Sequence, residues 1–262
     1  MEFVTMANRD YLPGVKTLFS SIEQNGQLSN VDFTVMCIGD LSAADAPEYD
    51  SLNTTVDFID ASELGDFEYN TGILKRDYKY INQNKFLIYK LPYDEPVCYV
   101  DADMLCLNDI SAIESLDPFS ACINLGGDPP YPIKERPMFN SGFFIFQPNE
   151  ETFSEVQEFV TNFDKMTKFG DQRLFNEYMY AERASDVNIL SLDWNVTITV
   201  KHYRPDLWDF VESEGIKVLH YTTVKPWDSP NFSDGLHRYY VDKRRQFRYR
   251  DEIEMWKKYY SS

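Results

Sequence analysis

Cys98-Tyr-Val-Asp-Ala-Asp-Met-Leu-Cys-Leu107 is the stretch around which we expect the chain to fold. The apolar run at 97–100 predicts a short buried strand, and two carboxylates, Asp101 and Asp103, follow where that strand ends. Side chains two residues apart on an extended segment point the same way, so these carboxylates are placed to share one divalent cation. A bare Asp-x-Asp also ends strands and caps helices. The flanking sequence therefore has to decide between a metal site and a turn.

Composition narrows the class of protein. The chain has 262 residues, 43% of them hydrophobic, which is enough for the core of one α/β domain with an excursion or two. Its formal net charge of −18 at pH 7 argues against nucleic acid as a partner, because an acidic surface repels phosphate backbones. An anionic ligand would need a local cluster of positive charge, supplied by a metal ion, lysines or helix N-termini.

The cysteines and the first residues predict a location for the protein. The cysteines show no close C-x-x-C spacing and lie mostly in apolar surroundings, which indicates reduced core thiols and suits a reducing cytoplasm. Met1 leads directly into a strand-like run, and no apolar run is long enough to cross a bilayer. We therefore expect a soluble, cytoplasmic protein. The four cysteines are Cys37, Cys98, Cys106 and Cys122.

Strand-like and helix-like segments alternate along the chain. This alternation predicts an α/β fold with a mostly parallel, Rossmann-like central sheet flanked by helices. The aromatic-rich segment 194–208 is expected to be a mobile or substrate-facing loop. The expected strands are 2–7, 33–38, 55–59, 97–100, 119–123, 143–146, 187–192 and 217–220, and the expected helices are 11–23, 85–91, 150–162 and 172–183.

Polar residues stand at the ends of several of these segments. The predicted turn 140–142, Asn-Ser-Gly, precedes an apolar strand and either binds a ligand or is a plain turn. Asp171 follows a glycine at a helix start, where an N-cap is the common use. His220 ends an apolar strand, and Lys225 comes five residues later, before Pro226 and Trp227. A lone histidine is more often packed in a core than bound to a metal, but this chain has only three.

Taken together and in this order, the motifs resemble glycosyltransferase family 8, the retaining enzymes with the GT-A fold. The resemblance covers about 3–227. It implies one GT-A catalytic domain over 1–237, a UDP-hexose donor, a glycan, lipid-linked or protein acceptor, and a manganese ion, with magnesium as the alternative. The basic and aromatic segment 238–262 is expected to form a solvated helix, with docking on a membrane or on an acidic partner the less favoured alternative. The oligomeric state stays open, with a dimer as one option.

The resemblance also implies roles for individual residues. Lys225 stabilises the leaving diphosphate, and Asp171 and Gln172 stabilise the sugar cation during attack from the same face. The family usually carries this lysine six residues after the histidine and a glycine where Thr223 stands. The implied contacts are Met6, Ala7, Asn8 and Tyr11 with uridine, Ala102 with ribose, Arg76, Lys85 and Lys225 with the phosphates, Asp101, Asp103 and His220 with the metal, and Asn140, Ser141, Asp171 and Gln172 with the sugar.

Other readings remain at the level of sequence. A metal-dependent phosphotransferase would use Asp101 and Asp103, but such sites usually gather three or more carboxylates. A non-catalytic protein that binds a sugar nucleotide or glycan would keep the fold and have lost turnover. Self-glucosylation, as in glycogenin, is a narrower possibility, because Tyr203 lies in the segment where glycogenin carries its acceptor tyrosine.

Overall fold

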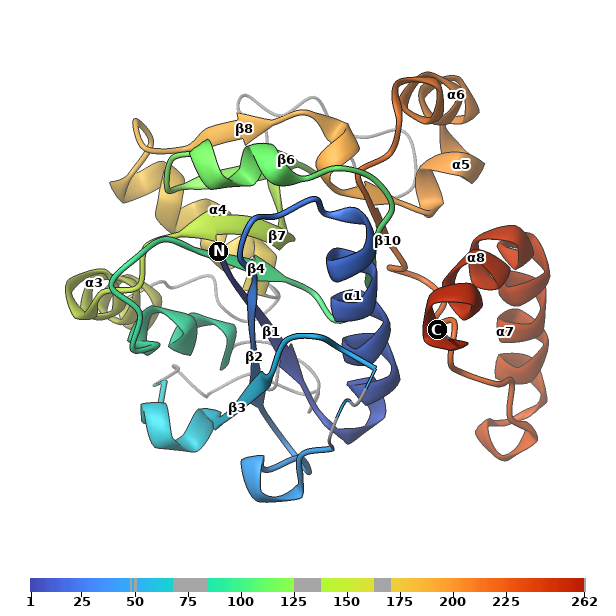
Figure 1. Cartoon of the computed structure of the whole chain (residues 1–262), viewed down its shortest axis with the longest axis horizontal. Helices are drawn as coiled ribbons and strands as arrows, with labels where there is room; N and C mark the ends of the chain where they lie inside the picture. The colour runs from blue at the N-terminus through green and yellow to red at the C-terminus, as the bar shows by residue number, and fades with distance from the viewer. Residues whose placement is uncertain (48, 50, 68–83, 125–137, 163–170, 262) are drawn as a thin grey trace.

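A seven-stranded sheet forms the centre of the molecule (Figure 1). The structure is a computed structural model, and it describes residues 1–47, 49, 51–67, 84–124, 138–162 and 171–261. The strand order in the sheet is β3-β2-β1-β4-β7-β6-β8. The strands are β1 (Glu2–Ala7), β2 (Asp32–Cys37), β3 (Val56–Asp60), β4 (Val97–Val100), β6 (Ser120–Ile123), β7 (Phe139–Phe146) and β8 (Asn188–Leu190).

The sheet is mostly parallel, as the alternating pattern predicts. Strand β7 runs antiparallel to both of its neighbours, β4 and β6, while the other neighbouring pairs are parallel. The expected turn over 140–142 is wrong, because these residues lie within β7 and are buried there. All eight residues of β7 are buried, since helices cover both of its faces.

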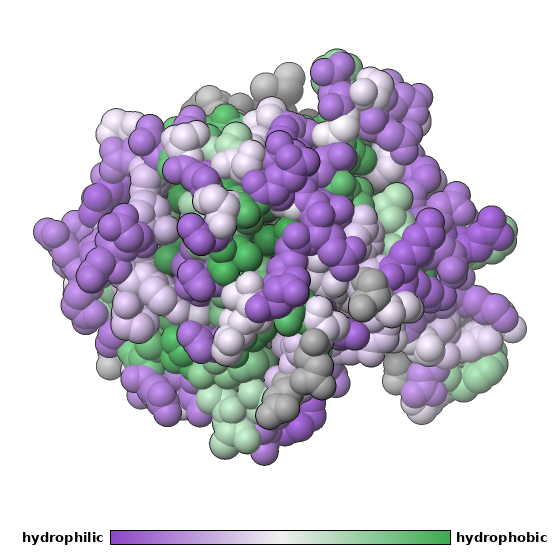
Figure 2. Space-filling view, viewed as in Figure 1, coloured by the Kyte–Doolittle hydropathy of each residue, from purple (hydrophilic) through white to green (hydrophobic). Residues whose placement is uncertain are grey.

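Two hydrophobic clusters lie on opposite faces of this sheet. Helix α1 (Leu12–Asn25) packs on one face, where its apolar residues Val15, Leu18, Phe19 and Ile22 recur at helical spacing. Helices α3 (Glu150–Asn162) and α4 (Asp171–Glu182) cover the other face. Outside these clusters the surface is mostly hydrophilic in the view of Figure 2, as expected for an acidic chain.

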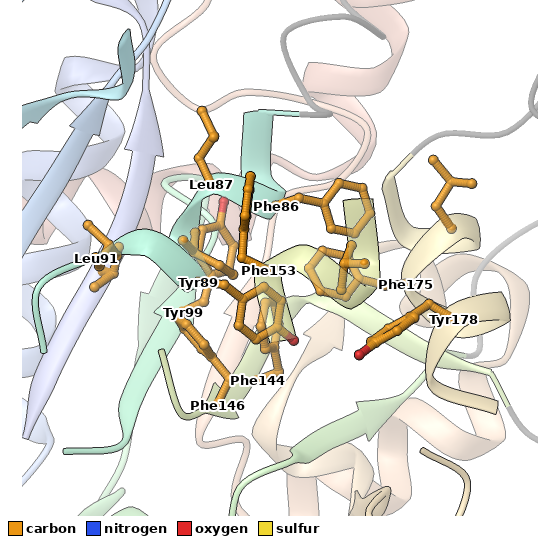
Figure 3. Close-up of a cluster of buried hydrophobic side chains, with 14 of the residues drawn as sticks. Phe86, Leu87, Tyr89, Leu91, Tyr99, Phe144, Phe146, Phe153, Phe175 and Tyr178 are labelled. Atoms are coloured by element: carbon orange, nitrogen blue, oxygen red, sulfur yellow. The ribbon is translucent and has the colours of Figure 1, made fainter. Parts of the chain in front are cut away.

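The cluster beneath α3 and α4 is rich in aromatic rings. Figure 3 shows rings from β4, β7, α3 and α4 meeting in one cluster, together with side chains from the 3₁₀ helix η5 (Asn84–Lys90). Phe86 stacks on Phe175 with ring centroids 4.4 Å apart, and Tyr99 stacks on Phe144 at 5.2 Å. This packing holds η5 against the strand that ends in the Asp-x-Asp pair. The expected helix over 85–91 therefore forms as a 3₁₀ helix.

A smaller, three-stranded sheet continues from the Asp-x-Asp pair. Its order is β5-β10-β9, with β10 antiparallel to β5 and parallel to β9. The expected loop over 194–208 is wrong: its apolar side chains are buried against this sheet, so the segment folds into regular elements. The elements of this region are β5 (Met104–Cys106), β9 (Val196–Thr197), β10 (Val218–His220), α5 (Thr199–Tyr203) and α6 (Pro205–Glu214).

The chain ends in two helices, where the sequence predicts one. They are α7 (Leu236–Arg248) and α8 (Arg250–Ser261), with Tyr249 between them. The chain turns there because Tyr249, Ile253 and Trp256 are buried in the same cluster as the smaller sheet. Helix α8 also packs on α1, and α7 lies outside it (Figure 1). Among the described helices, none has the length and apolar character needed to cross a membrane.

Candidate functional site

One cleft collects the polar residues at the carboxyl ends of β1 and β4. Strands β1 and β4 are parallel neighbours, so their ends meet at the same edge of the sheet. The start of α4, strand β7 and the end of β10 close the cleft from the other sides. Its lining consists of Met6, Ala7, Asn8, Tyr11, Ile38, Lys85, Tyr99, Asp101, Ala102, Asp103, Asn140, Ser141, Asp171, Gln172, His220, Thr222 and Lys225.

Backbone hydrogen bonds place the two aspartates and the histidine together. The N–H of Asp101 donates to the carbonyl of Gly142 at 2.7 Å, which fixes the end of β4 against β7. Antiparallel pairing sets His220 opposite Met104, and the N–H of Tyr221 donates to the carbonyl of Asp103 at 2.9 Å. As a result, Nε2 of His220 lies 3.3 Å from Oδ1 of Asp103 and 3.8 Å from Oδ2 of Asp101.

Asn195 orients the imidazole. Its Oδ1 lies 3.1 Å from Nδ1 of His220, and both residues are buried. An amide oxygen accepts a hydrogen bond, so Nδ1 donates to Asn195, and Nε2 is the ring nitrogen that faces the carboxylates. Ligand atoms of Asp101, Asp103 and His220 all lie within 4.8 Å of one another. Three electron-rich groups at this separation fit a bound cation.

Two glycines allow this close approach. A Cβ on Gly142 would lie 2.6 Å from Oδ2 of Asp101 and 2.8 Å from Cε1 of His220, so any side chain there would collide with both groups. A Cβ on Gly14 would lie 2.4 Å from the carbonyl oxygen of Ala102. Glycine at both positions therefore lets β7 and α1 approach the Asp-x-Asp loop closely.

Lys225 is paired with the second aspartate. Its Nζ donates to Oδ2 of Asp103 and to the carbonyl of Tyr221, the latter at 3.0 Å. Burial alone would raise the pKa of Asp103, but Lys225 and His220 outweigh it and hold that pKa below its usual range. Burial alone would lower the pKa of Lys225, yet the Asp103 charge raises it. Both groups are therefore charged at neutral pH.

Lys85 bridges the first aspartate and the start of α4. Its Nζ lies 3.0 Å from Oδ1 of Asp101, 3.1 Å from Oδ2 of Asp171, and 3.1 Å from the carbonyl of Ser141. Burial favours the neutral amine, but the carboxylates, with Tyr99, raise the pKa of Lys85 well above its ordinary value. The ammonium of Lys85 thus links Asp101 to Asp171 at the other end of the cleft.

Asp171 and its neighbours form that other end. Asp171 is the first residue of α4, and its Oδ2 accepts a hydrogen bond from Oγ of Ser141 at 3.0 Å. Oε1 of Gln172 accepts from the N–H of Ser141 at 3.3 Å. Oδ1 of Asn140 accepts from the N–H of Gly142 at 2.8 Å. These contacts tie α4 to β7 and turn several polar groups toward one space.

The predicted site residues gather in this cleft, apart from Arg76, which lies outside the described residues. Tyr203 does not line the cleft. Ile38, Tyr99 and Thr222 also line the cleft, although their sequence positions did not predict it. Tyr99 had a signal, because it lies on β4 two residues before Asp101, and its hydroxyl donates to Asp101 at 2.9 Å. Asn195 had no such signal, because its contact with His220 spans 25 residues.

Fold and site together define an α/β protein in which carboxylates, an imidazole and two ammonium groups converge at the carboxyl edge of a mostly parallel sheet. Residues 3–230 match the model of glycosyl transferase family 8, and the chain belongs to this family.

Curated relatives are identical to this chain at about a quarter of the aligned residues. Glycogenin-1 of Mus musculus is 27% identical over 233 residues, which cover 86% of this chain and 65% of glycogenin-1. UDP-glucuronate:xylan alpha-glucuronosyltransferase 1 of Arabidopsis thaliana is 28% identical over 156 residues, 58% of this chain and 22% of that protein. The chain thus spans less than two thirds of the length of these relatives.

A solved structure shows the same fold. The galactosyltransferase LgtC, crystallised with donor and acceptor sugar analogs, superposes with a TM-score of 0.61 at 17% sequence identity. The superposition covers 92% of this chain and 94% of that one. The architecture is therefore the GT-A fold, as the sequence motifs predict.

Proposed function

We propose that this chain is a retaining glycosyltransferase that moves a hexose, glucose or galactose, from a UDP-sugar to a glycan, lipid-linked or protein acceptor. Family membership and the named activities of the relatives support a sugar-nucleotide donor. The observation that carries the proposal is the convergence of Asp101, Asp103 and His220 beside Lys85 and Lys225. A cation site next to two ammonium groups fits the paired phosphates of a nucleotide. The proposed catalytic domain spans 1–237.

The donor atoms of the site fit a divalent metal. Asp101, Asp103 and His220 would hold it, with Nε2 of His220 facing both carboxylates and open space beside Gly142. Carboxylate and imidazole ligands suit Mn²⁺, with Mg²⁺ as the alternative. A bound metal would act as a Lewis acid toward the diphosphate. This set has too few carboxylates for a typical two-metal phosphotransferase, which argues for the glycosyltransferase.

The chain's own residues have separate roles in this proposal. Breaking the bond between sugar and diphosphate builds negative charge on the leaving oxygen, and Lys225 stabilises that charge. Lys85 binds the diphosphate and orients Asp171 through their ion pair. Asp171 and Gln172 face the anomeric carbon and stabilise positive charge on the sugar as the acceptor attacks from the same face. The departing phosphate takes the acceptor's proton.

Other cleft residues would bind the remaining parts of the donor. In the same proposal Met6, Ala7, Asn8 and Tyr11 contact uridine, and Ala102 contacts ribose. Arg76 reaches the phosphates, and Asn140 and Ser141 hold hydroxyls of the sugar.

Metal-dependent release of UDP from a panel of UDP-sugars tests this proposal. Wild-type protein should release UDP only with added Mn²⁺ or Mg²⁺, and Asp103→Asn should lower the rate by about 100-fold or more. The control is Asp94→Asn, which removes an exposed carboxylate outside the cleft and should keep the wild-type rate. A chain that binds UDP with metal and turns over no UDP-sugar would be a binding protein, and the proposal would fail.

Mass spectrometry separates two narrower mechanisms. Same-face attack without a covalent intermediate predicts no glycosyl adduct on Asp171 during turnover. Self-glucosylation predicts added hexose on the intact protein, removed by Tyr203→Phe. We expect no adduct on Asp171, because the proposed attack involves no covalent intermediate. We also expect no added hexose, because Tyr203 does not line the cleft.

A further inference from the structure

Helix α7 presents one face to solvent along its whole length. None of its thirteen residues is buried, and its half-buried residues, among them Asp242 and Gln246, lie on the side toward the protein. Nε2 of Gln246 donates to the carbonyl of Asp228 at 2.6 Å and fixes that side inward. At about 100° per residue, the opposite side centres near Tyr240. Figure 1 shows α7 at the outer edge of the molecule, with α8 between it and α1.

Large apolar side chains cluster on and beside this outer face. Leu236 is 61% exposed, Tyr240 61% and Phe247 79%, and Phe232 in the preceding 3₁₀ helix is 63% exposed. The three residues on α7 fall within about 40° of one another around the helix axis. Of the six large hydrophobic side chains that are exposed among the described residues, four lie in this short segment. An exposed apolar stripe of this kind indicates an interaction surface.

Basic side chains accompany the apolar stripe. Lys243 and Arg244 are exposed and lie within about 60° of Phe247 around the axis. Over α7 as a whole, five lysines and arginines stand against one aspartate, whereas the chain carries a net charge of −18. In Figure 2 the region of the C-terminal helices is mostly hydrophilic, with small hydrophobic patches at its outer edge. The helix is therefore a small positive, amphipathic surface on an acidic body.

We propose that the outer face of α7 docks this protein on an anionic lipid bilayer. Aromatic and leucine side chains enter the headgroup region at any spacing, while a folded partner would need a matching cavity for each of them. Lysine and arginine between these side chains gain from negative lipid charge. The acidic body is repelled by the same charge, so only this face meets the bilayer. Docking by α7 is independent of the activity proposed above.

Co-sedimentation of the full chain with lipid vesicles tests the proposal. Wild-type protein should bind vesicles that contain phosphatidylglycerol and should not bind phosphatidylcholine alone. Lys243→Gln with Arg244→Gln should weaken binding roughly fivefold for each charge removed. Tyr240→Ser with Phe247→Ser should bring binding close to the phosphatidylcholine level. Added salt should weaken the binding of the wild type.

Matched variants locate the effect on α7. Lys257→Gln with Lys258→Gln removes the same charge from exposed positions of α8, and Phe210→Ser removes a 60% exposed ring from α6. Both controls should bind like wild type, and thermal melting should be unchanged in all variants. Absence of binding to anionic vesicles overturns the proposal, and so does an equal loss in the controls. A dimer in solution that the α7 variants abolish also overturns it, since the face would then bind a second copy.

Discussion

At the scale of single residues, Lys225 and a divalent cation would need the same carboxylate. Nζ of Lys225 pairs with Oδ2 of Asp103, and Asp103 belongs to the proposed metal site. Lys225→Met should therefore raise the affinity for Mn²⁺ measured without nucleotide, by about tenfold if the pair is a typical charge-assisted hydrogen bond. The same change should weaken the binding of UDP in the presence of Mn²⁺, because a charge beside the phosphates is lost.

Calorimetric titration with Mn²⁺, and then with UDP, measures both effects. Lys225→Arg keeps a cation at this position and should stay near wild type in the metal titration. Weaker Mn²⁺ binding by Lys225→Met would show that the lysine supports the metal site and does not compete with it.

Lys85 predicts a specific pH dependence of stability. Its folded pKa lies well above the unfolded value of about 10.4, so its contribution is fully present below that pH and is lost as the pH rises through the folded pKa. Lys85→Met leaves Asp101 and Asp171 without their shared cation and should lower the free energy of unfolding by about 3 kcal/mol at pH 8. The difference from wild type should shrink above about pH 10.4.

Urea unfolding at a series of pH values measures this difference. Lys258→Met, at an exposed position on α8, is the control and should follow wild type throughout. A difference that stays constant up to the highest pH would mean that Lys85 acts through packing and not through its charge.

At the scale of elements, helix α8 supports the loop that carries Lys225. The ring of Trp256 is 2% exposed, and its centroid lies 5.6 Å from Trp227 and 5.0 Å from Tyr260. Trp227 in turn contacts Tyr11 in the cleft at 5.5 Å. Trp256→Ala should lower the free energy of unfolding by about 3 to 5 kcal/mol, because a large buried ring leaves a cavity.

Trp256→Phe is the matched comparison. The Nε1 atom of Trp256 is buried without a hydrogen-bond partner among the described residues, so phenylalanine keeps most of the ring and removes that unsatisfied group. Trp256→Phe should therefore lower the free energy of unfolding clearly less than Trp256→Ala, as measured by chemical denaturation. Equal losses in the two variants would contradict the packing role of the ring.

The elements also show what local patterns miss. Most strands and helices lie within one or two residues of the predicted segments, because apolar periodicity reports which face is buried. The segment 140–142 was predicted as a turn from its Asn-Ser-Gly composition, yet it lies within β7, whose other residues pair with β4 on one side and β6 on the other. The segment 194–208 folds because a second sheet covers it, and that sheet joins strands from distant parts of the chain.

At the scale of the whole molecule, burial should protect all four cysteine thiols from reagents in solution. All four cysteines are free and buried. Burial raises the pKa of Cys37 and Cys106 to about 12, and it raises the pKa of Cys98 and Cys122 well above 9. A raised pKa keeps a thiol protonated and slow to react. Native protein at pH 8 should therefore react with a thiol reagent hardly at all, and in denaturant all four should react.

Timed labelling with a chromogenic disulfide reagent checks this. Rapid reaction of one thiol in the native protein would contradict this prediction. Mass spectrometry of the labelled protein would then identify which cysteine is accessible.

The sequence by itself determined the family, the alternation of strands and helices, and the candidate side chains, because these follow from local patterns of apolar and polar residues. Tertiary structure alone decided how those side chains meet. Antiparallel pairing of β10 with β5 brings His220 beside Asp103, although 117 residues separate them in the chain. Asn195 turns the imidazole, and Gly142 leaves the space. Such contacts depend on hydrogen bonds and packing between distant segments, which no local pattern contains.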